Sequence, residues 1–183
     1  MAEIGASSYR RFLQGDKNAL AEFICQYSDA LVRFAYGYVR DSAAAEDVAA
    51  ESIAILFVKA KKFRDEGSMR AYLYKIARNQ AVDYLRRHKN EVPLEDVENI
   101  LGSGDPEEDM LRRERDAALY RAMQNLPQQY RQVLELAYFE AFSVDQIRTV
   151  LGKNAKQVYN LLARARSALK LQLQKEAITY EDL

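Results

Sequence analysis

Basic and amide side chains at helical spacing near the C-terminus could bind DNA. At about 100° per residue, Lys156, Gln157, Asn160 and Arg164 fall on one side of a single helix, and Lys153 lies just before it. Lysine and arginine suit guanine edges and phosphates, whereas asparagine and glutamine can pair bidentately with adenine. We therefore expect these five residues to contact duplex DNA in the major groove.

Two helix-start signals position this face. Ser143 with Gln146, and Asn154 with Gln157, have the spacing of capping boxes, so helices should begin near 144 and 155. Gly152 lies between them and enters the left-handed conformation that ends a helix at little cost. This pattern predicts a helix-turn-helix. The second helix has one apolar stripe that must be buried: Val158, Leu161, Leu162, Ala165 and Leu169.

Local charge favours the same interpretation. Residues 146–175 include seven basic residues and no acidic one, a charge of +7, although the formal net charge of the chain is zero. Two capped helices around a glycine also occur in helical bundles, and a basic face is usually only solvated. The absence of acids from this segment favours DNA binding over that alternative.

A second basic segment covers residues 59–89, where ten cationic residues minus three acidic ones give a charge of +7. Tyrosines in its helix could stack on unpaired bases, although tyrosines at helical spacing are more often core residues. The loop just before this helix, Lys62-Phe63-Arg64, could hold such a base. The candidate side chains for unpaired DNA share one helix face: Lys75, Arg78, Asn79 and Arg86.

Acidic residues gather in residues 88–110, which contain one Lys or Arg and eight acids, for a charge of −7. Gly102, Gly104 and Pro106 would interrupt any helix there. We expect a flexible acidic linker at 89–110 between small helical domains at 1–88 and 111–183. The linker is either a solvated tether or a segment that covers the nucleic-acid surfaces until DNA displaces it.

A smaller acidic group, Glu46, Asp47 and Glu51, lies near the start of a helix expected from about residue 42. Acids near a helix start suit the helix dipole, so this group has an ordinary structural explanation. A protein-docking face is the functional alternative.

Composition indicates an all-α protein without catalytic machinery. The chain has 183 residues, 49% of them hydrophobic, with only seven Gly and three Pro for turns. One cysteine and one histidine exclude an internal disulfide and a multi-histidine or cysteine metal site. Neither a Ser, His and Asp set nor a phosphate-binding glycine loop can be assembled, so we expect no enzyme activity and no cofactor. Without a membrane-length apolar stretch or a signal sequence, we expect a cytoplasmic protein with no membrane insertion.

Three motifs occur in a fixed order: Ala45-Glu46-Asp47-Val48 with Glu51; Ala71-Tyr72-Leu73-Tyr74-Lys75-Ile76-Ala77-Arg78-Asn79 with Asp83 and Arg86-Arg87; and Leu126-Pro127 with Tyr130-Arg131, Val133-Leu134-Glu135-Leu136, Ile147, Leu151-Gly152, Val158 and Arg164-Ala165. Together they resemble the extracytoplasmic-function sigma factors of bacterial RNA polymerase over nearly the whole chain. In that family the first motif is the polymerase-docking helix, the second is the promoter-melting helix, and the third is the helix-turn-helix that binds the upstream promoter element.

The resemblance implies two helical domains joined by a flexible linker, with core RNA polymerase and promoter DNA as partners. It implies that Glu46, Asp47 and Glu51 bind polymerase, and that the two basic faces recognise the upstream (−35) and downstream (−10) elements. Such factors often have an anti-sigma partner, and they require no cofactor. Four positions depart from common family residues: Ala50, Ile53, Tyr72 and Arg148.

Two other functions would fit parts of the sequence. A simple helix-turn-helix regulator that binds duplex DNA, alone or as a dimer, leaves the second basic face unexplained. A helical adaptor that binds only proteins does not explain the acid-free recognition helix.

Overall fold

The computed structural model describes residues 3–88, 119 and 121–181, and side chains from residue 8 to residue 175 within those ranges. Every regular element of this part is a helix, which confirms the all-α prediction. None of the described helices is both long and apolar enough to cross a membrane. The expected linker at 89–110 lies outside the described residues. The elements are α1 (Glu3–Leu13), α2 (Ala19–Val39), α3 (Ser42–Lys59), α4 (Glu66–Arg87), α6 (Gln128–Leu134), the π-helical turn η1 (Glu135–Phe139), α7 (Val144–Leu151) and α8 (Ala155–Glu181).

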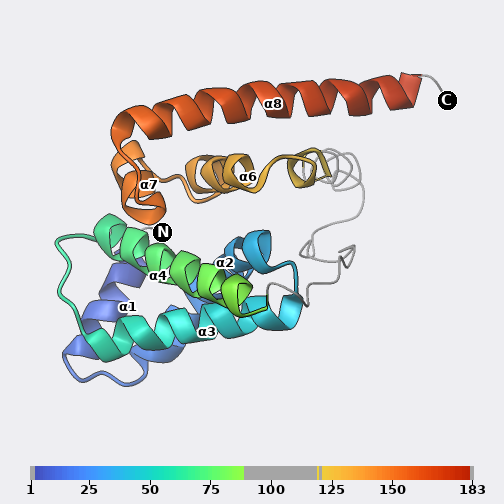
Figure 1. Ribbon diagram of the computed structural model, residues 1–183. Coiled ribbons are helices and arrows are strands. Elements are labelled where there is room, and N and C mark those ends of the chain that lie inside the picture. The colour runs from blue at the N-terminus through green and yellow to red at the C-terminus, as the bar shows by residue number, and fades with distance from the viewer. Residues whose placement is uncertain (1–2, 89–118, 120, 182–183) are drawn as a thin grey trace, which may run out of the picture.

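Helices α1 to α4 form an N-terminal bundle around aromatic side chains (Figure 1). Phe23 is fully buried, and its ring centroid lies 4.5 Å from that of Tyr27 and 4.9 Å from that of Phe57. Tyr9 of α1 packs edge-on against Phe57 at 5.3 Å. The sequence patterns described above did not predict helix α1.

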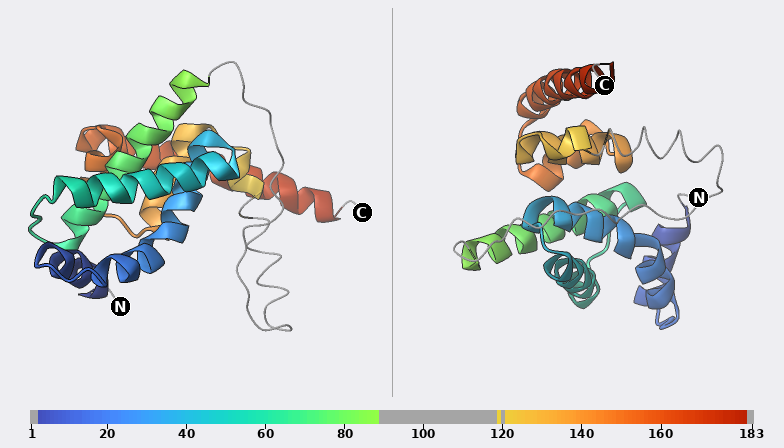
Figure 2. Two further views of the ribbon diagram at one scale, coloured as in Figure 1. Left: turned by 90° about the horizontal axis from the view of Figure 1, so that it is seen from below. Right: turned by 90° about the vertical axis from the view of Figure 1, so that its right-hand side faces the viewer.

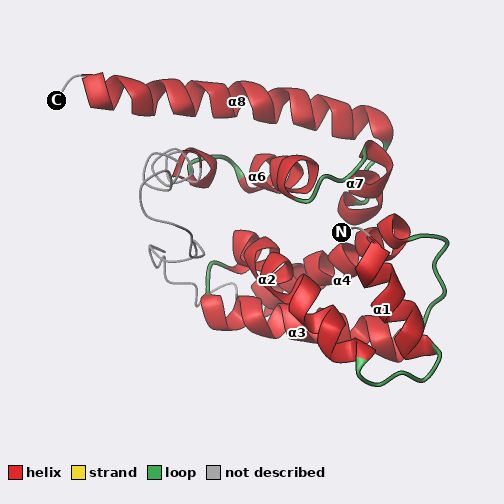
Figure 3. Cartoon of the chain, turned by 180° about the vertical axis from the view of Figure 1, so that it is seen from behind, coloured by secondary structure: helices red, strands yellow, loops and turns green. Residues whose placement is uncertain are grey.

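The ends of these helices are set by short polar side chains. The carboxylate of Asp41 accepts a hydrogen bond from the Ala44 amide at 2.8 Å and starts α3. Asp65 starts α4 in the same way, accepting from the Ser68 amide at 2.7 Å, and the Ser68 side chain bonds back. A cap at Ser68 would start α4 three residues later. With Asp65 as the cap, α4 begins directly after the loop at 60–65, which lies beside α1 (Figure 3).

The C-terminal half contains the predicted helix-turn-helix. The Ser143 amide donates to the Gln146 side chain at 2.7 Å, and the Ser143 hydroxyl accepts from the Gln146 amide at 3.3 Å. Asn154 and Gln157 form the same reciprocal pair, with both bonds at 2.9 Å. Gly152 ends α7 with a φ of +65°. Helices α7 and α8 therefore begin at 144 and 155, as the two capping boxes predicted.

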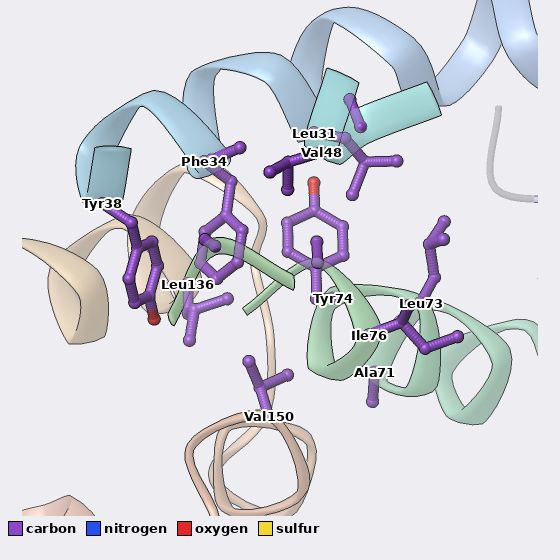
Figure 4. Close-up of a cluster of buried hydrophobic side chains, with 14 of the residues drawn as sticks. Leu31, Phe34, Tyr38, Val48, Ala71, Leu73, Tyr74, Ile76, Leu136 and Val150 are labelled. Atoms are coloured by element: carbon purple, nitrogen blue, oxygen red, sulfur yellow. The ribbon is translucent and has the colours of Figure 1, made fainter. Parts of the chain in front are cut away.

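The two halves of the chain pack directly on each other. Helix α7 lies against α4, and α6 lies against α2, whereas α8 lies on the side away from the N-terminal bundle (Figures 1 and 2). Tyr74 of α4 is fully buried, with its ring centroid 5.0 Å from that of Phe34 and 5.1 Å from that of Phe142. Leu136 and Val150 approach the same region from the C-terminal half (Figure 4). One apolar cluster thus spans both halves.

Gly152 offers a test of the turn between α7 and α8. A Cβ added there would meet no other atom within 4 Å, so the positive φ alone opposes a side chain. We expect Gly152→Ala to lower the free energy of unfolding by about 1 kcal/mol. Gly152→Asn should lose less, since asparagine tolerates this conformation better. Urea denaturation followed by circular dichroism measures both, and equal losses would contradict the explanation.

Candidate nucleic-acid interface

The predicted duplex-reading face lies on the first turns of α8. Lys156, Asn160 and Arg164 are all exposed there, at spacings of four residues. Val158 and Ala165 are fully buried on the opposite side and fix the rotation of the helix against α6 and α7. The structure therefore brings the amide and the two cations onto one open surface, as the periodicity predicted.

Two residues of the predicted set are less available than their types suggest. The Gln157 side-chain oxygen accepts the Asn154 amide at 2.9 Å, so this glutamine is part of the helix cap and only its Nε2 group remains to donate. A bidentate pair with adenine uses both ends of the amide, so the Gln157 oxygen would have to serve the cap and the base together. Lys153 is half-buried in the turn before α8.

Other cations of the acid-free segment contact groups outside the reading face. Arg166 donates to the Tyr138 hydroxyl at 2.6 Å, and its guanidinium lies 5.6 Å from that ring centroid. Arg148 forms an ion pair with Asp145 at 2.8 Å, one turn earlier in α7. The charge of +7 over residues 146–175 therefore exceeds the number of cations on the duplex-reading face of α8.

The predicted face for unpaired DNA lies on α4. Lys75, Asn79 and Arg86 are exposed, and Arg86 makes only a long 3.5 Å ion pair with Asp83. Exposed pairs of this kind contribute little, so Arg86 can exchange Asp83 for a phosphate. Leu73 and Ala77 are fully buried and hold the opposite side of α4 in the bundle.

Arg78 differs from the other members of this face. It is half-buried, and its buried Nε atom has no hydrogen-bond partner. Its charge acts on Tyr38 of α2, whose pKa burial raises above the usual range while Arg78 opposes that shift. Helical periodicity grouped Arg78 with Lys75 and Asn79 because it gives each residue's angle around the helix. Periodicity does not show that a neighbouring element partly buries Arg78.

The loop at 60–65 and α1 form most of the lining of an open cavity of about 370 Å³. Such a volume lies within the range of small-ligand sites, roughly 300–1,000 Å³. Lys62 and Phe63, which were predicted to hold a base, line this cavity, whereas Arg64 is exposed and donates to Asp65 at 2.9 Å. Arg10 of α1 and Gln14, which directly follows that helix, also line it. They were not predicted, because α1 itself was not expected.

Local hydrogen bonds hold the cavity walls. The Tyr9 hydroxyl donates to the Lys61 carbonyl at 2.8 Å, which ties the loop to α1. The Lys61 ammonium lies 4.8 Å from the ring centroid of Tyr72 and 5.7 Å from that of Phe63. The Ser68 amide, and then the Arg64 guanidinium, lower the pKa of Asp65 to about 2, so this cap stays ionised.

The acidic group assigned to protein docking lies on the outer side of α3. Glu46, Asp47 and Glu51 are exposed, whereas Val48 and Ala49 between them are buried. Asp41 caps the helix, and none of these three acids lies in the first turn, where the helix dipole acts most strongly. They remain available for a partner.

Charged groups also meet where the two halves touch. Arg70 of α4 forms an ion pair with Glu140 at 3.0 Å, and Arg131 of α6 donates to the Gly37 carbonyl of α2 at 3.4 Å. Arg40, which caps the C-terminal end of α2, donates to the Gln124 side chain. Burial, and then the neighbouring Glu140 carboxylate, raise the pKa of Glu135 to about 7, while Arg33 and Arg131 act in the opposite direction.

Comparison with known proteins gives two family matches in chain order. Residues 23–91 match the family model for Sigma-70 region 2, and residues 116–169 match that for Sigma-70, region 4. The chain is 31% identical to the RNA polymerase sigma-H factor of Pseudomonas aeruginosa, covering 90% of this chain and 91% of that protein. It is 28% identical to the RNA polymerase sigma factor SigV of Bacillus subtilis, covering 91% and 98%, and 27% identical to the ECF RNA polymerase sigma factor SigW of the same species, covering 87% and 91%.

Two solved structures have a similar fold. CnrH, in complex with the cytosolic domain of CnrY, gives a TM-score of 0.65 at 19% identity and covers 94% of this chain and 99% of its own. The sigma factor RpoE from Bartonella quintana, in complex with the anti-sigma factor NepR, gives a TM-score of 0.66 at 21% identity, covering 84% and 96%.

Glu135 should make stability depend on pH. A carboxyl whose pKa is raised by folding, here from 4.5 to about 7, contributes fully below the lower value and loses that contribution as pH rises through the upper one. We expect wild type and Glu135→Gln to have similar Tm values near about pH 5, and the glutamine variant to be the more stable near about pH 8. The charges that face this carboxyl are Arg33, Arg131 and Glu140. Thermal unfolding across this range tests the shift, and a pH-independent difference would contradict it.

Proposed function

The chain belongs to the ECF type of the sigma-70 family of RNA polymerase sigma factors, and we propose that it selects and opens promoters through the faces of α8 and α4. A sigma factor is a non-catalytic subunit that binds core RNA polymerase and directs promoter-specific initiation. A simple helix-turn-helix regulator and a protein-binding adaptor are thereby set aside. The observation that carries the proposal is that both candidate faces are exposed on helices whose opposite sides are buried.

We propose that α8 reads the upstream element in the major groove. Asn160 is the residue best placed for a base contact, since its amide is exposed between the exposed cations Lys156 and Arg164. Lys156 then contacts a base edge or a phosphate, and Arg164 a phosphate. Gln157 supports the DNA-reading face by capping α8, and Lys153 lies in the turn before that helix. Neither residue makes a bidentate base contact.

We propose that α4 and the loop before it capture the downstream element after its bases leave the duplex. Extruding a base costs a few kcal/mol, so a protein that binds the unpaired form shifts the opening equilibrium forward. Lys75, Asn79 and Arg86 contact the unpaired DNA strand along α4. The cavity lined by Lys62 and Phe63 receives one base of that strand. Arg64 and Arg78 lie at the edges of this path.

The remaining assignments concern partners and place of action. Exposed Glu46, Asp47 and Glu51 on α3 offer carboxylates for ion pairs with core polymerase. An anti-sigma factor is a further proposed partner, because both similar solved structures are complexes, with the anti-sigma factor NepR and with the cytosolic domain of CnrY. The place of action is the cytoplasm, where bacterial polymerase transcribes.

Substitutions in α8 test the upstream assignment. We expect Asn160→Ala to reduce the discrimination between bases at one position of the upstream element. It should also weaken promoter binding by about 1–3 kcal/mol, the value of a lost bidentate contact. Arg164→Ala should lower affinity on all sequences and reduce the salt dependence by roughly one unit of slope. Binding of the holoenzyme to promoter variants, at several salt concentrations, measures both effects.

The matched control is Asn125→Ala, an exposed asparagine before α6. It should change neither promoter preference nor salt slope. An unchanged preference in both Asn160→Ala and Lys156→Ala would remove this face from the proposal.

Substitutions in α4 test promoter opening and, with it, the proposed function. We expect Asn79→Ala and Arg86→Ala to leave polymerase binding and upstream recognition nearly intact while reducing open complexes, because captured bases drive the opening. Permanganate reactivity of unpaired thymines reports the opening. A template with a premelted bubble should restore part of the lost activity.

Lys17→Ala is the control for removing an exposed cation, since Lys17 lies in the loop between α1 and α2. It should open promoters as well as wild type. Two results would refute the assignment. Either the two α4 variants open promoters normally, or the premelted template restores no activity because the variants no longer bind polymerase.

A further inference from the structure

Helix α1 lies outside the part of the chain that matches Sigma-70 region 2, since that match begins at residue 23. It nevertheless lines the cavity beside the loop at 60–65, through Tyr9, Arg10 and Leu13. The ring centroids of Tyr9 and Phe57 are 5.3 Å apart, which anchors α1 in the core of the bundle. One wall of the cavity is therefore supplied by a helix that precedes the matched residues.

Two hydrogen bonds join α1 to the loop that forms the facing wall. The Tyr9 hydroxyl donates to the Lys61 carbonyl at 2.8 Å, and Arg10 donates through Nη2 to the Arg64 carbonyl at 3.4 Å. Between these two points the ring centroid of Phe63 lies 5.7 Å from that of Tyr9. The position of α1 relative to the loop is thus held at both ends of the cavity.

Part of the cavity lining is apolar and suits the flat surface of a base. Tyr9 and Met69 are buried, with exposed fractions of 3% and 1%, and Leu13 and Phe63 also line the space. A ring such as that of Phe63 can stack on a base, but every base has a π-face, so stacking is tolerant of sequence. These contacts favour capture of a base without selecting which one.

Asp65 supplies a group that can only accept hydrogen bonds. Its Oδ1 accepts from the Ser68 amide at 2.7 Å, and its Oδ2 accepts from Arg64 Nε at 2.9 Å. These bonds hold the pKa of Asp65 at about 2, so the carboxyl is ionised at neutral pH. A carboxylate has about four lone-pair sites, so each oxygen can accept one further bond from a group in the cavity.

The cations of the cavity have the opposite property. Arg10 and Lys62 both line it, and their side chains can only donate hydrogen bonds. They also offset the charge of Asp65, which would otherwise repel the phosphates beside a captured base. Gln14 lines the cavity too, but an amide can donate or accept and therefore adapts to any base. The fixed polarity of the cavity comes from Asp65 on one side and the cations on the other.

Three of the four DNA bases carry an exocyclic amino group with an acceptor beside it: N1 in adenine, N3 in cytosine and O6 on the same edge of guanine. Thymine has no amino group, and it would place a carbonyl oxygen against the Asp65 carboxylate, where neither group can donate. We propose that α1 and Asp65 form a base-reading site, in which Asp65 accepts from the amino group of the captured base, Arg10 donates to the acceptor beside it, and thymine is rejected. The inference rests on the proposed capture of a base in this cavity.

The first test measures base preference with the full chain bound to core polymerase. The templates are premelted across the downstream element, so that duplex opening does not limit binding, and each position of the element carries each of the four bases in turn. We expect one position at which thymine binds about tenfold more weakly than the other three bases, a factor within the range of a single base contact.

Asp65→Asn then reverses the polarity of the site without removing the helix cap. Asparagine caps about as well as aspartate, and its oxygen can still accept from the Ser68 amide. Its NH₂ group now donates to a thymine carbonyl, so the penalty for thymine at that position should disappear. The matched control is Asp41→Asn, which alters the equivalent cap of α3 away from the cavity. Asp41→Asn should keep the penalty.

Base analogues test the amino group itself. At the sensitive position, purine replaces adenine, or 2-pyrimidinone replaces cytosine, and each analogue lacks only the amino group. With the wild-type chain we expect the analogue to bind about tenfold more weakly than the natural base. With Asp65→Asn the two should bind within about twofold of each other, because the acceptor that used the amino group is gone. An equal loss in both proteins would show that Asp65 acts only through the cap, and would overturn the proposal.

Arg10→Ala tests the contribution of α1. We expect it to weaken binding of the three amino-bearing bases about tenfold while leaving thymine nearly unchanged, because Arg10 donates to the acceptor beside the amino group. A contact to phosphate would instead weaken all four bases equally, and that result would refute the role of α1. Lys17→Ala, which removes an exposed cation outside the cavity, should bind every template as wild type does.

An abasic nucleotide placed at each position separates this inference from the proposed function. If an abasic nucleotide weakens binding at some position, but thymine is accepted there or Asp65→Asn keeps the wild-type preference, base capture stands and the base-reading site is refuted. If no abasic position weakens binding and none penalises thymine, capture in the cavity fails and this inference fails with it.

Discussion

Burial of Tyr74 is the interaction on which the arrangement of the two halves depends. Its ring is fully enclosed, with Phe34 of the N-terminal bundle at 5.0 Å and Phe142 of the C-terminal half at 5.1 Å. Neither half alone supplies both neighbours. Separating the halves would expose this ring to water, which favours closure, whereas the unpartnered hydroxyl of Tyr74 and the charged groups around it oppose closure. The balance between these opposing terms, and not either alone, sets how readily the chain opens.

Local structure could be predicted well from the sequence because its causes are local. The capping boxes of Ser143 and Asn154 and the left-handed Gly152 involve residues at most three positions apart, and all of them are present. The exposed positions of Lys156 and Asn160 followed from helical periodicity alone. Helix caps of this kind can be recognised in a single sequence because the groups that bond to each other lie within one helical turn.

Features that depend on distant partners could not be predicted. Arg70 and Glu140 are 70 positions apart, and neither one's surroundings indicate the other. The half-burial of Arg78 and the wall that α1 gives to the cavity have the same origin, since both depend on packing between separate elements. Gln157 differs from these residues, because it was expected both to cap α8 and to contact a base, and the structure shows the cap.

The length of a promoter gives an independent reason for the contact to open. Elements at about −35 and −10 are separated by about 25 base pairs, or roughly 85 Å of duplex. A compact chain of 183 residues has an expected radius of gyration of about 16 Å, and the 27 residues of α8 extend only about 40 Å. With α7 packed on α4, the faces of α8 and α4 therefore lie too close together to reach both elements at once. The apolar cluster around Tyr74 and Phe142 opposes that separation, whereas the Arg70–Glu140 ion pair can be replaced by contacts with phosphates or polymerase side chains. Recognition of both elements at once therefore requires that contacts with polymerase and promoter compensate for the exposure of this apolar cluster.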